Sequence, residues 1–236
     1  MRNTLTITAK EFKSYLSSPM AYIIIAIFLA LTGFFFSSDA ATFSETSLSG
    51  FLQMGSLLLL LMTAVLTMRL LAEERKLGTI ELLLTAPVRD SEIILGKFLG
   101  SLGIVLVMII LTFYYPILLQ IFGDPDIGPI FSGYLGLFLL SCAALSIGIF
   151  ASSITSNQIV SAVVAGGILF GLWYVGVAAS YLPAAVSKVI GYFSLSTYFP
   201  FFTAGIIDTK GIIYYLSITV IFLFLAIRSL ENSRWS

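Results

Sequence analysis

Histidine is absent from this chain of 236 residues, and cysteine occurs only once. Without histidine, neither a histidine-ligated zinc site nor a serine–histidine catalytic pair can form. The single cysteine, Cys142, excludes a disulfide framework and a thiolate metal site within the chain. These absences predict a chain that is not itself an enzyme and that binds no metal.

The phosphate-binding loop of nucleotide hydrolases is also missing. The pair Gly96–Lys97 is followed by Phe98 and lacks the upstream glycine of the motif that cradles ATP phosphates. We therefore expect this chain to hydrolyse no nucleotide and to bind no cofactor. The formal net charge of zero gives no sign of a nucleic-acid partner.

Charge is scarce and apolar residues dominate. Charged residues make up 10% of the chain and hydrophobic residues 58%, with a mean hydropathy of +1.04, whereas about a quarter of the residues in a soluble domain are charged. The sequence thus predicts an all-α integral membrane protein embedded in the lipid bilayer. No repeat or low-complexity linker divides residues 1–236, so we expect a single domain.

Six apolar segments approach or exceed the length of about 20 residues with which a helix crosses a bilayer. The predicted spans are about 20–36, 51–71, 98–122, 130–151, 159–182 and 211–227. Pro116 predicts a kink in the third span, which is tolerable where a neighbouring helix bonds the freed carbonyl. The spans as drawn contain no acidic residue and no central basic residue. Because ion-coupled transporters usually carry ionisable groups near the membrane midplane, any driving force is expected to come from outside this chain.

The basic residues are distributed unevenly between the two sides of the predicted membrane. Six spans place both termini on the same side as the loop Glu73–Lys97, and only Lys188 and Lys210 of the twelve lysines and arginines fall on the other side. The positive-inside rule therefore predicts that both termini and this loop are cytoplasmic. The ten residues on that side are Arg2, Lys10, Lys13, Arg69, Arg75, Lys76, Arg89, Lys97, Arg228 and Arg234.

The first eighteen residues form a polar segment before the first span. Phe12, Tyr15 and Leu16 recur at helical spacing, with Lys10 and Lys13 on the other side. This pattern predicts an interfacial helix that lies along the cytoplasmic surface. A frayed tail is the alternative.

Glu73–Lys97 is the one long polar, charge-rich passage in the chain. Its charges cluster at its two ends, and Ile80, Leu83 and Leu84 fall on one side at helical spacing. The pattern predicts a short amphipathic helix between the second and third spans. The alternative is a solvated connecting loop, but a simple turn needs only a few residues and no leucine-rich face.

The same passage resembles the first cytoplasmic loop of ABC-2 type permeases, the membrane subunits of one class of ATP-binding-cassette transporters. The resemblance rests on EER..GT.E.LL..P, followed by GKF at the start of the next span. Within that family, TIELLLTAPVRDSEIILGKFLG is most similar to gliding-motility-associated permeases and next to copper–nitrous-oxide-reductase maturation permeases. The resemblance extends to KEFKSYLSSPMAYI and to the closing YFPFFTAGIIDTKGIIYYLSITVIFLFLAIRSLENSRW, and so covers nearly the whole chain.

The resemblance implies a transporter permease in the bacterial inner membrane, expected to export its substrate. It implies a separate cytoplasmic ATPase that binds ATP and magnesium, and a homodimer or a pairing with a second permease. Gliding-type relatives further imply an auxiliary membrane protein. By the family match, the leucine face is the buried anchor of a coupling helix that contacts the ATPase. The residues of this docking site are Glu73, Glu74, Gly78, Thr79, Glu81, Leu83, Leu84 and Pro87.

A different class of function stays open on the residues alone. The chain could be a membrane assembly or scaffold protein whose Glu73–Lys97 loop binds a cytoplasmic partner without transport. A neighbouring reading frame that encodes a soluble protein with Walker motifs would favour the permease.

The passage Pro183–Asp208, between the fifth and sixth spans, is apolar in runs too short to cross a membrane and is broken by prolines and glycines. It predicts re-entrant or interfacial helices. Its aromatic residues form either an exit lid for the transported molecule or an anchor in the membrane interface, and the sequence favours neither. The candidate lid residues are Tyr192, Phe193, Tyr198, Phe199, Phe201 and Phe202.

Pairs of glycines recur at the spacing with which membrane helices pack closely. Gly96 and Gly100 form one pair, and Gly167 and Gly171 another. Because glycine is common in membrane helices, each pair is a weak indication of a dimer interface.

Overall fold

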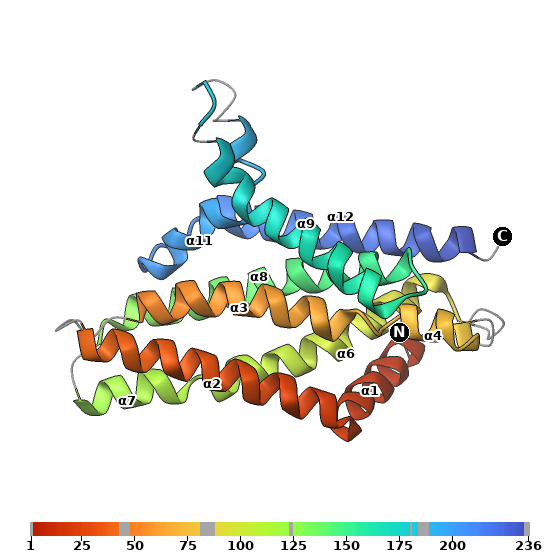
Figure 1. Ribbon diagram of the computed structural model, residues 1–236, viewed down its shortest axis with the longest axis horizontal. Coiled ribbons are helices and arrows are strands. Elements are labelled where there is room, and N and C mark those ends of the chain that lie inside the picture. The colour runs from red at the N-terminus through yellow and green to blue at the C-terminus, as the bar shows by residue number, and fades with distance from the viewer. Residues whose placement is uncertain are drawn as a thin grey trace.

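The computed structural model describes residues 2–42, 48–80, 88–122, 125–179, 181–183 and 189–233. Every regular element in these ranges is a helix, and six stretches are long and apolar enough to cross a membrane, which confirms the predicted fold class. Figure 1 shows the long helices running roughly side by side, with α9 inclined away from the others. The helices are α1 (Arg2–Ser17), α2 (Pro19–Thr42), α3 (Ser49–Thr67), α4 (Ala72–Lys76), α6 (Asp90–Leu111), α7 (Tyr114–Phe122), α8 (Ile127–Ser153), α9 (Gln158–Ala179), α11 (Leu195–Thr203) and α12 (Thr209–Ser233).

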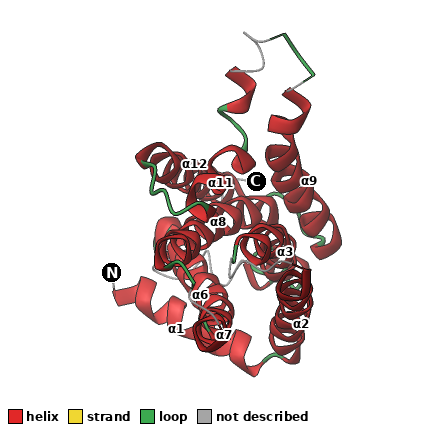
Figure 2. Ribbon diagram, turned by 90° about the vertical axis from the view of Figure 1, so that its left-hand side faces the viewer, coloured by secondary structure: helices red, strands yellow, loops and turns green. Residues whose placement is uncertain are grey.

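Helix α8 lies at the centre of the bundle, where it contacts α3, α6, α9, α11 and α12 (Figure 2). Small residues on α8 make these close approaches possible. A Cβ added to Gly148 would collide with Thr67 of α3, and one added to Gly136 would lie 2.8 Å from the Cβ of Phe202 in α11. The outer helices α2, α9 and α12 instead expose large apolar side chains, as helices that face lipid do; examples are Ile23, Phe34, Val163, Tyr174, Val220 and Phe224.

The third predicted span begins earlier than its apolar residues indicate. Helix α6 starts at Asp90 and not at Phe98, because the polar residues before the span form the first turns of the helix. The Glu92 carboxylate accepts a hydrogen bond from the Arg89 backbone N–H at 3.3 Å, and Asp90 and Glu92 both lie in the first turn, where carboxylates stabilise the helix N-terminus. The sequence Asp90–Lys97 is therefore helix and not part of a connecting loop.

The predicted kink at Pro116 is confirmed as a break between α6 and α7 at Thr112–Phe113. Proline has no N–H to donate to the carbonyl four residues earlier, which is that of Thr112. That carbonyl accepts instead from the Tyr115 N–H at 3.0 Å and from the Tyr134 hydroxyl of α8 at 2.9 Å. A neighbouring helix thus satisfies the freed carbonyl, as a helix break within a membrane requires.

The other spans differ from their predicted bounds mainly at their ends. Helix α2 continues beyond Phe36, since the hydroxyls of Ser37 and Ser38 donate to the Phe34 carbonyl, each at 2.9 Å, and so remain within the helix. Helix α12 continues past Ile227 to Ser233. Hydropathy marks the apolar part of such a helix and not the point where its backbone hydrogen bonding stops.

The first segment is a helix, as predicted, and it packs against α6. Three glycines of α6 form the surface on which α1 lies. A Cβ added to Gly96 would lie 2.6 Å from Ile7, and one added to Gly100 would lie 2.6 Å from Glu11. A Cβ added to Gly103 would lie 2.8 Å from Phe12. The pair Gly96 and Gly100 therefore serves a contact within the chain. Of the predicted apolar face, Tyr15 is buried and Leu16 is exposed. An added Cβ at Gly167 or Gly171 of α9 meets nothing within 4 Å.

Candidate functional site

Helix α1, α4, the start of α6 and the end of α12 lie together at the end of the bundle that carries both labelled termini (Figure 1). We call this the charged end, after Lys10, Glu11, Arg69, Glu73, Glu74 and Lys97, which line one pocket there. Helices α7 and α11 lie toward the opposite end, which we call the aromatic end after Tyr115, Tyr134, Tyr198, Phe199, Phe202 and Tyr215.

The described part of the predicted docking site begins in α4 and continues through the turn after it, at the charged end. The chain turns at Gly78, whose φ of 71° lies in the left-handed region that favours glycine. Leu77 is 66% exposed, and Thr79 is exposed beside it. Glu73 and Glu74 lie within α4 and are partly exposed. The remaining predicted docking residues, Glu81, Leu83, Leu84 and Pro87, lie outside the described residues.

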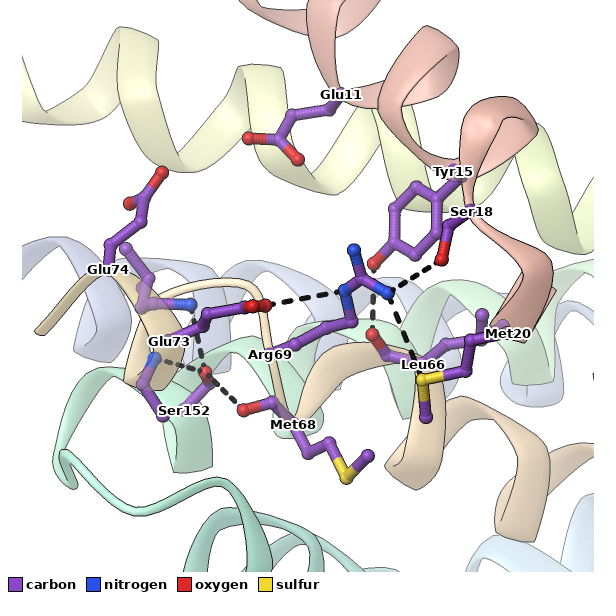
Figure 3. A network of polar contacts seen from close by, with 12 residues as sticks. Glu11, Tyr15, Ser18, Met20, Leu66, Met68, Arg69, Glu73, Glu74 and Ser152 are labelled. Carbon is purple, nitrogen blue, oxygen red and sulfur yellow. Dashed lines mark hydrogen bonds and ion pairs between the residues drawn. The ribbon is translucent and has the colours of Figure 1, made fainter. Parts of the chain in front are cut away.

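The turn that leads into α4 is fixed by Ser152, near the end of α8. Its hydroxyl accepts hydrogen bonds from the backbone N–H groups of Leu71 and Ala72, both at 3.0 Å, and lies 3.4 Å from the Met68 carbonyl to which it donates (Figure 3). The first N–H groups of a helix have no acceptor within that helix. The central helix therefore supplies the acceptor that α4 needs.

Arg69, in the turn after α3, joins this turn to both α1 and α4 (Figure 3). Its Nη1 donates to the Ser18 hydroxyl at 3.1 Å, and its Nε lies 3.5 Å from the Glu73 carboxylate. The guanidinium also lies over the Tyr15 ring, 5.7 Å from its centroid. One side chain thus contacts the end of α1 and the first turn of the docking segment.

Tyr15 holds α1 against the end of α3. Its hydroxyl donates to the Leu66 carbonyl at 2.9 Å, and its side chain is buried. Burial, and next the nearby Glu11 carboxylate, raises the pKa of Tyr15 above its ordinary value. The phenol therefore remains a neutral donor.

Lys97 differs most from its predicted environment. The sequence pattern placed it at the edge of a water-exposed loop, whereas its side chain is only 2% exposed in α6. Its Nζ donates to Glu11 of α1 at 2.8 Å and to Glu74 of α4 at 2.7 Å. Figure 3 shows these two carboxylates extending toward one another from α1 and α4. The second oxygen of Glu74 is buried and has no hydrogen-bond partner among the described residues.

A pocket of about 210 Å³ lies between α1 and the α3–α4 turn. Three cations and three carboxylates line it together with Tyr15, Ser14, Leu70 and Leu77, so the charges of its described lining residues balance. The exposed Leu77 lines this pocket. Glu74 also lines it and is a residue of the predicted docking site. The pocket therefore connects the docking segment with α1.

The predicted lid residues divide into two groups. Tyr198, Phe199 and Phe202 of α11 are buried against the bundle, while Phe201 of α11 and the preceding Tyr192 and Phe193 are exposed. Helix α11 is short and does not span the membrane, which agrees with the predicted interfacial or re-entrant helix. The structure thus brings together only half of the predicted lid as a packed face.

Hydrogen bonds to backbone carbonyls hold α11 in place. Ser194, just before α11, and Ser196 both donate to the Trp173 carbonyl of α9, at 3.0 and 2.7 Å. Ser132 of α8 donates to the Phe202 carbonyl at 2.6 Å. Burial raises the pKa of the Tyr198 phenol, and the neighbouring Tyr192 adds to this effect. All of these groups are neutral.

A second pocket, of about 420 Å³, lies between α3, α9 and α11 at the aromatic end. Its polar groups are an amide and several hydroxyls, and among the described residues that line it there is no lysine, arginine, aspartate or glutamate. Such walls suit a molecule that is partly apolar and forms hydrogen bonds without carrying charge. The lining residues are Gln53, Leu57, Trp173, Tyr174, Val177, Ser196, Phe199, Pro200 and Thr203.

Sequence patterns alone did not identify several residues of these sites. The partners Glu11 and Lys97 are 86 positions apart, and Ser152 falls in an apolar helix where a serine carries no particular signal. The closely spaced Gly96 and Gly100 did signal a close helix neighbour, although not that the neighbour is α1. Among the described residues, no three histidine, cysteine or acidic side chains gather where they could hold a metal ion.

The family comparison covers both sites. Residues 5–234 match the model of a family described as ABC-2 family transporter protein. A search of curated proteins found no match. The matched residues run from α1 to the end of α12, so the docking segment, the pocket behind it and α11 all fall within them. This multi-pass membrane chain therefore belongs to the ABC-2 family of transporter proteins.

Proposed function

We propose that this chain is the permease subunit of an ATP-driven transporter, and that the segment from Glu73 to Pro87 docks on a separate ATPase subunit. The observation that carries the proposal is the exposed Leu77 beyond α4, beside the partly exposed carboxylates of Glu73 and Glu74. An apolar side chain rimmed by charges is typical of a protein interface. Permeases of this family generally work with an ATPase subunit.

In this proposal the charged end faces the cytoplasm. Basic residues of α1, α4, the start of α6 and the end of α12 gather there, whereas Lys210 lies at the first turn of α12, toward the aromatic end. The positive-inside rule supports this orientation in a bacterial inner membrane. The partner ATPase would then bind ATP and magnesium in the cytoplasm, and the permease would bind neither.

The geometry of α4 supports a mechanical role for the docking segment. Helix α4 continues from α3 through a tight turn and is bonded to α8 through Ser152. A force applied to α4 by closing ATPase subunits would therefore act on a membrane-crossing helix and on the central helix of the bundle. Binding energy from ATP would reach the transport path in this way.

The pocket at the aromatic end supports export of a molecule without formal charge. It lies beneath α11, opposite the proposed ATPase site, and is lined by aromatic rings, hydroxyls and one amide. In the proposed cycle α11 is the exit lid, and its displacement opens this pocket to the far side of the membrane.

A complete transporter in this proposal contains a second permease chain, either a second copy or a paralogue. The open glycines Gly167 and Gly171 leave room on α9 for a helix of that chain. The resemblance of the docking segment to gliding-motility permeases makes an auxiliary membrane protein a further expected partner.

The test is co-purification with an ATPase that carries Walker motifs and is encoded in a neighbouring reading frame. Replacing Leu83 and Leu84 by Asp should abolish co-purification and leave membrane insertion intact, because two charges would enter the apolar anchor. Leu5→Asp is the matched control: Leu5 is 66% exposed on α1 at the same end, and its replacement should leave the complex intact. Survival of the complex in the double variant overturns the docking model. A complex whose ATP hydrolysis is indifferent to the permease would favour the scaffold.

A further inference from the structure

We propose that Lys97 is a positioning residue that transmits movement of the docking segment to α1. The inference rests on the proposed docking function and extends it, since it makes the helix before the first span part of the coupling machinery. The position of Lys97 in the sequence does not predict a role in docking, because Lys97 lies in α6 and not in the docking segment itself.

The first step is that α1 lies directly against the start of α6. Backbone atoms of α1 approach the glycine face of α6: the Thr4 carbonyl would lie 3.2 Å from a Cβ at Gly96, and the Thr8 carbonyl 3.3 Å from one at Gly100. The Asn3 side chain also donates to Glu92 at 3.2 Å. The two backbones are this close along the glycine face, so α1 lies where Lys97 of α6 can reach the Glu11 carboxylate.

The second step is that Lys97 joins α4 to α1. Between α1 and α4, the described residues show two charged bridges. Arg69 forms the weaker one, with a 3.5 Å separation from a Glu73 side chain that is 39% exposed. Lys97 forms the shorter and more buried one. Its Nζ lies 2.7 Å from the Glu74 carboxylate and 2.8 Å from the Glu11 carboxylate, and its side chain is 2% exposed.

The third step concerns why a lysine is buried between two carboxylates, those of Glu11 and Glu74, which are themselves 14% and 21% exposed. A buried ion pair stabilises a fold little more than well-packed apolar side chains, but breaking it by removing one partner is strongly unfavourable. The arrangement therefore fixes the position of α4 relative to α1 and penalises any movement of one without the other. Because α1 leads directly into α2 through Ser18 and Pro19, displacement of α1 also moves the first span.

The experiment measures backbone hydrogen exchange in the full permease–ATPase complex in lipid nanodiscs, without nucleotide and with ATP trapped. In the wild type, exchange in both α4 and α1 should change several-fold between the two states. Glu11→Gln removes only the α1 arm of the bridge, and Glu74→Gln removes only the α4 arm. In each variant the α4 response should remain and the α1 response should be lost. A merely structural role would alter α1 exchange equally in both nucleotide states and leave the difference between them.

Arg228→Met is the matched control, since it removes an exposed ion pair with Glu231 at the same end and should preserve both responses. If either Gln variant keeps the full α1 response, or if wild-type α1 does not respond while α4 does, the role of Lys97 is refuted. Should Glu74→Gln fail to assemble, Glu11→Gln decides alone because Glu11 lies outside the docking segment. If the proposed docking function itself is wrong, the result is distinguishable: the ATPase would not bind the wild-type permease, or hydrogen exchange in α4 would not respond to nucleotide.

Discussion

Helices α1 and α11 lie at opposite ends of the molecule, and each rests on glycines of longer helices. Helix α1 lies on Gly96 and Gly100, while α11 lies on Gly136. They differ in the bonds that hold them. The Lys97–Glu11 ion pair fixes α1 in addition to the neutral bond from Tyr15 to Leu66, whereas the bonds described for α11 come from neutral hydroxyl groups that donate to backbone carbonyls, including Tyr215 to Leu195 at 2.8 Å.

This difference shows how each end can respond to a partner. Ion pairs at the charged end can be rearranged by charges that an incoming protein brings, because such pairs depend on the field around them. Neutral hydrogen bonds at the aromatic end carry no net charge into the apolar surroundings and are indifferent to that field. A peripheral helix held by charges is suited to receiving a signal, and one held by neutral bonds is suited to closing a path.

The largest expected effect comes from adding a methyl group at the glycines on which α1 and α11 lie. Gly100→Ala places a Cβ 2.6 Å from Glu11, and Gly136→Ala places one 2.8 Å from Phe202. Each should lower the free energy of unfolding by about 1–3 kcal/mol, the usual cost of overpacking a close contact. Thermal unfolding in detergent measures this change.

Gly166→Ala in α9 provides the control, since its Cβ meets nothing within 4 Å and alanine favours a helix over glycine by about 0.5–1 kcal/mol. Alanine at Gly100 or Gly136 should therefore lower the free energy of unfolding, whereas alanine at the open position on α9 should raise it. Equal stability of all three variants would show that the glycine contacts do not determine where α1 and α11 lie.

Local patterns predicted the membrane helices because the causes are local. Runs of apolar residues identify the six spans, and Pro116 breaks its helix through the missing N–H whatever the rest of the chain does. The same reasoning explains why α1 was predicted as a helix. Ends were less predictable: polar residues such as Asp90 and Glu92 look like a loop, although they form the first turn of α6.

The charged network could not be predicted from local patterns because its members come from distant positions. Nothing near Lys97 in the sequence indicates that Glu11 will neutralise it, and a lysine close to a span ordinarily marks an exposed boundary. The division of the candidate lid has a similar origin. Tyr198, Phe199 and Phe202 are buried because α11 packs on α8 and α12, which aromatic composition alone does not reveal.

Cysteine labelling tests whether α11, at the aromatic end, moves when ATP binds. Single cysteines at Ser194, Ser196 and Thr203, in a Cys142→Ser background, are labelled with a membrane-impermeant thiol reagent, with and without trapped ATP. Ser196 and Thr203 line the larger pocket, whereas Ser194 is fully buried. If α11 is a lid, labelling at these positions should change several-fold with nucleotide. An interfacial anchor would give identical labelling in both states at all three positions.

The smallest expected effect concerns the break between α6 and α7, which the aromatic end also stabilises with a neutral bond. Tyr134 is buried, and its hydroxyl donates to the Thr112 carbonyl at 2.9 Å. Tyr134→Phe removes that donor and leaves the carbonyl with the Tyr115 N–H. The free energy of unfolding should fall by about 1 kcal/mol, the net worth of one such hydrogen bond.

Tyr22→Phe is the matched control, because the Tyr22 hydroxyl also donates to a backbone carbonyl, that of Leu16 at 2.7 Å, but from an exposed position. Its loss should change stability by less than the loss at Tyr134, since an exposed carbonyl can find another partner and a buried one cannot. Thermal unfolding of the two variants side by side measures the difference. If Tyr134→Phe is as stable as Tyr22→Phe, the break at Thr112 does not depend on the hydrogen bond from Tyr134 of α8.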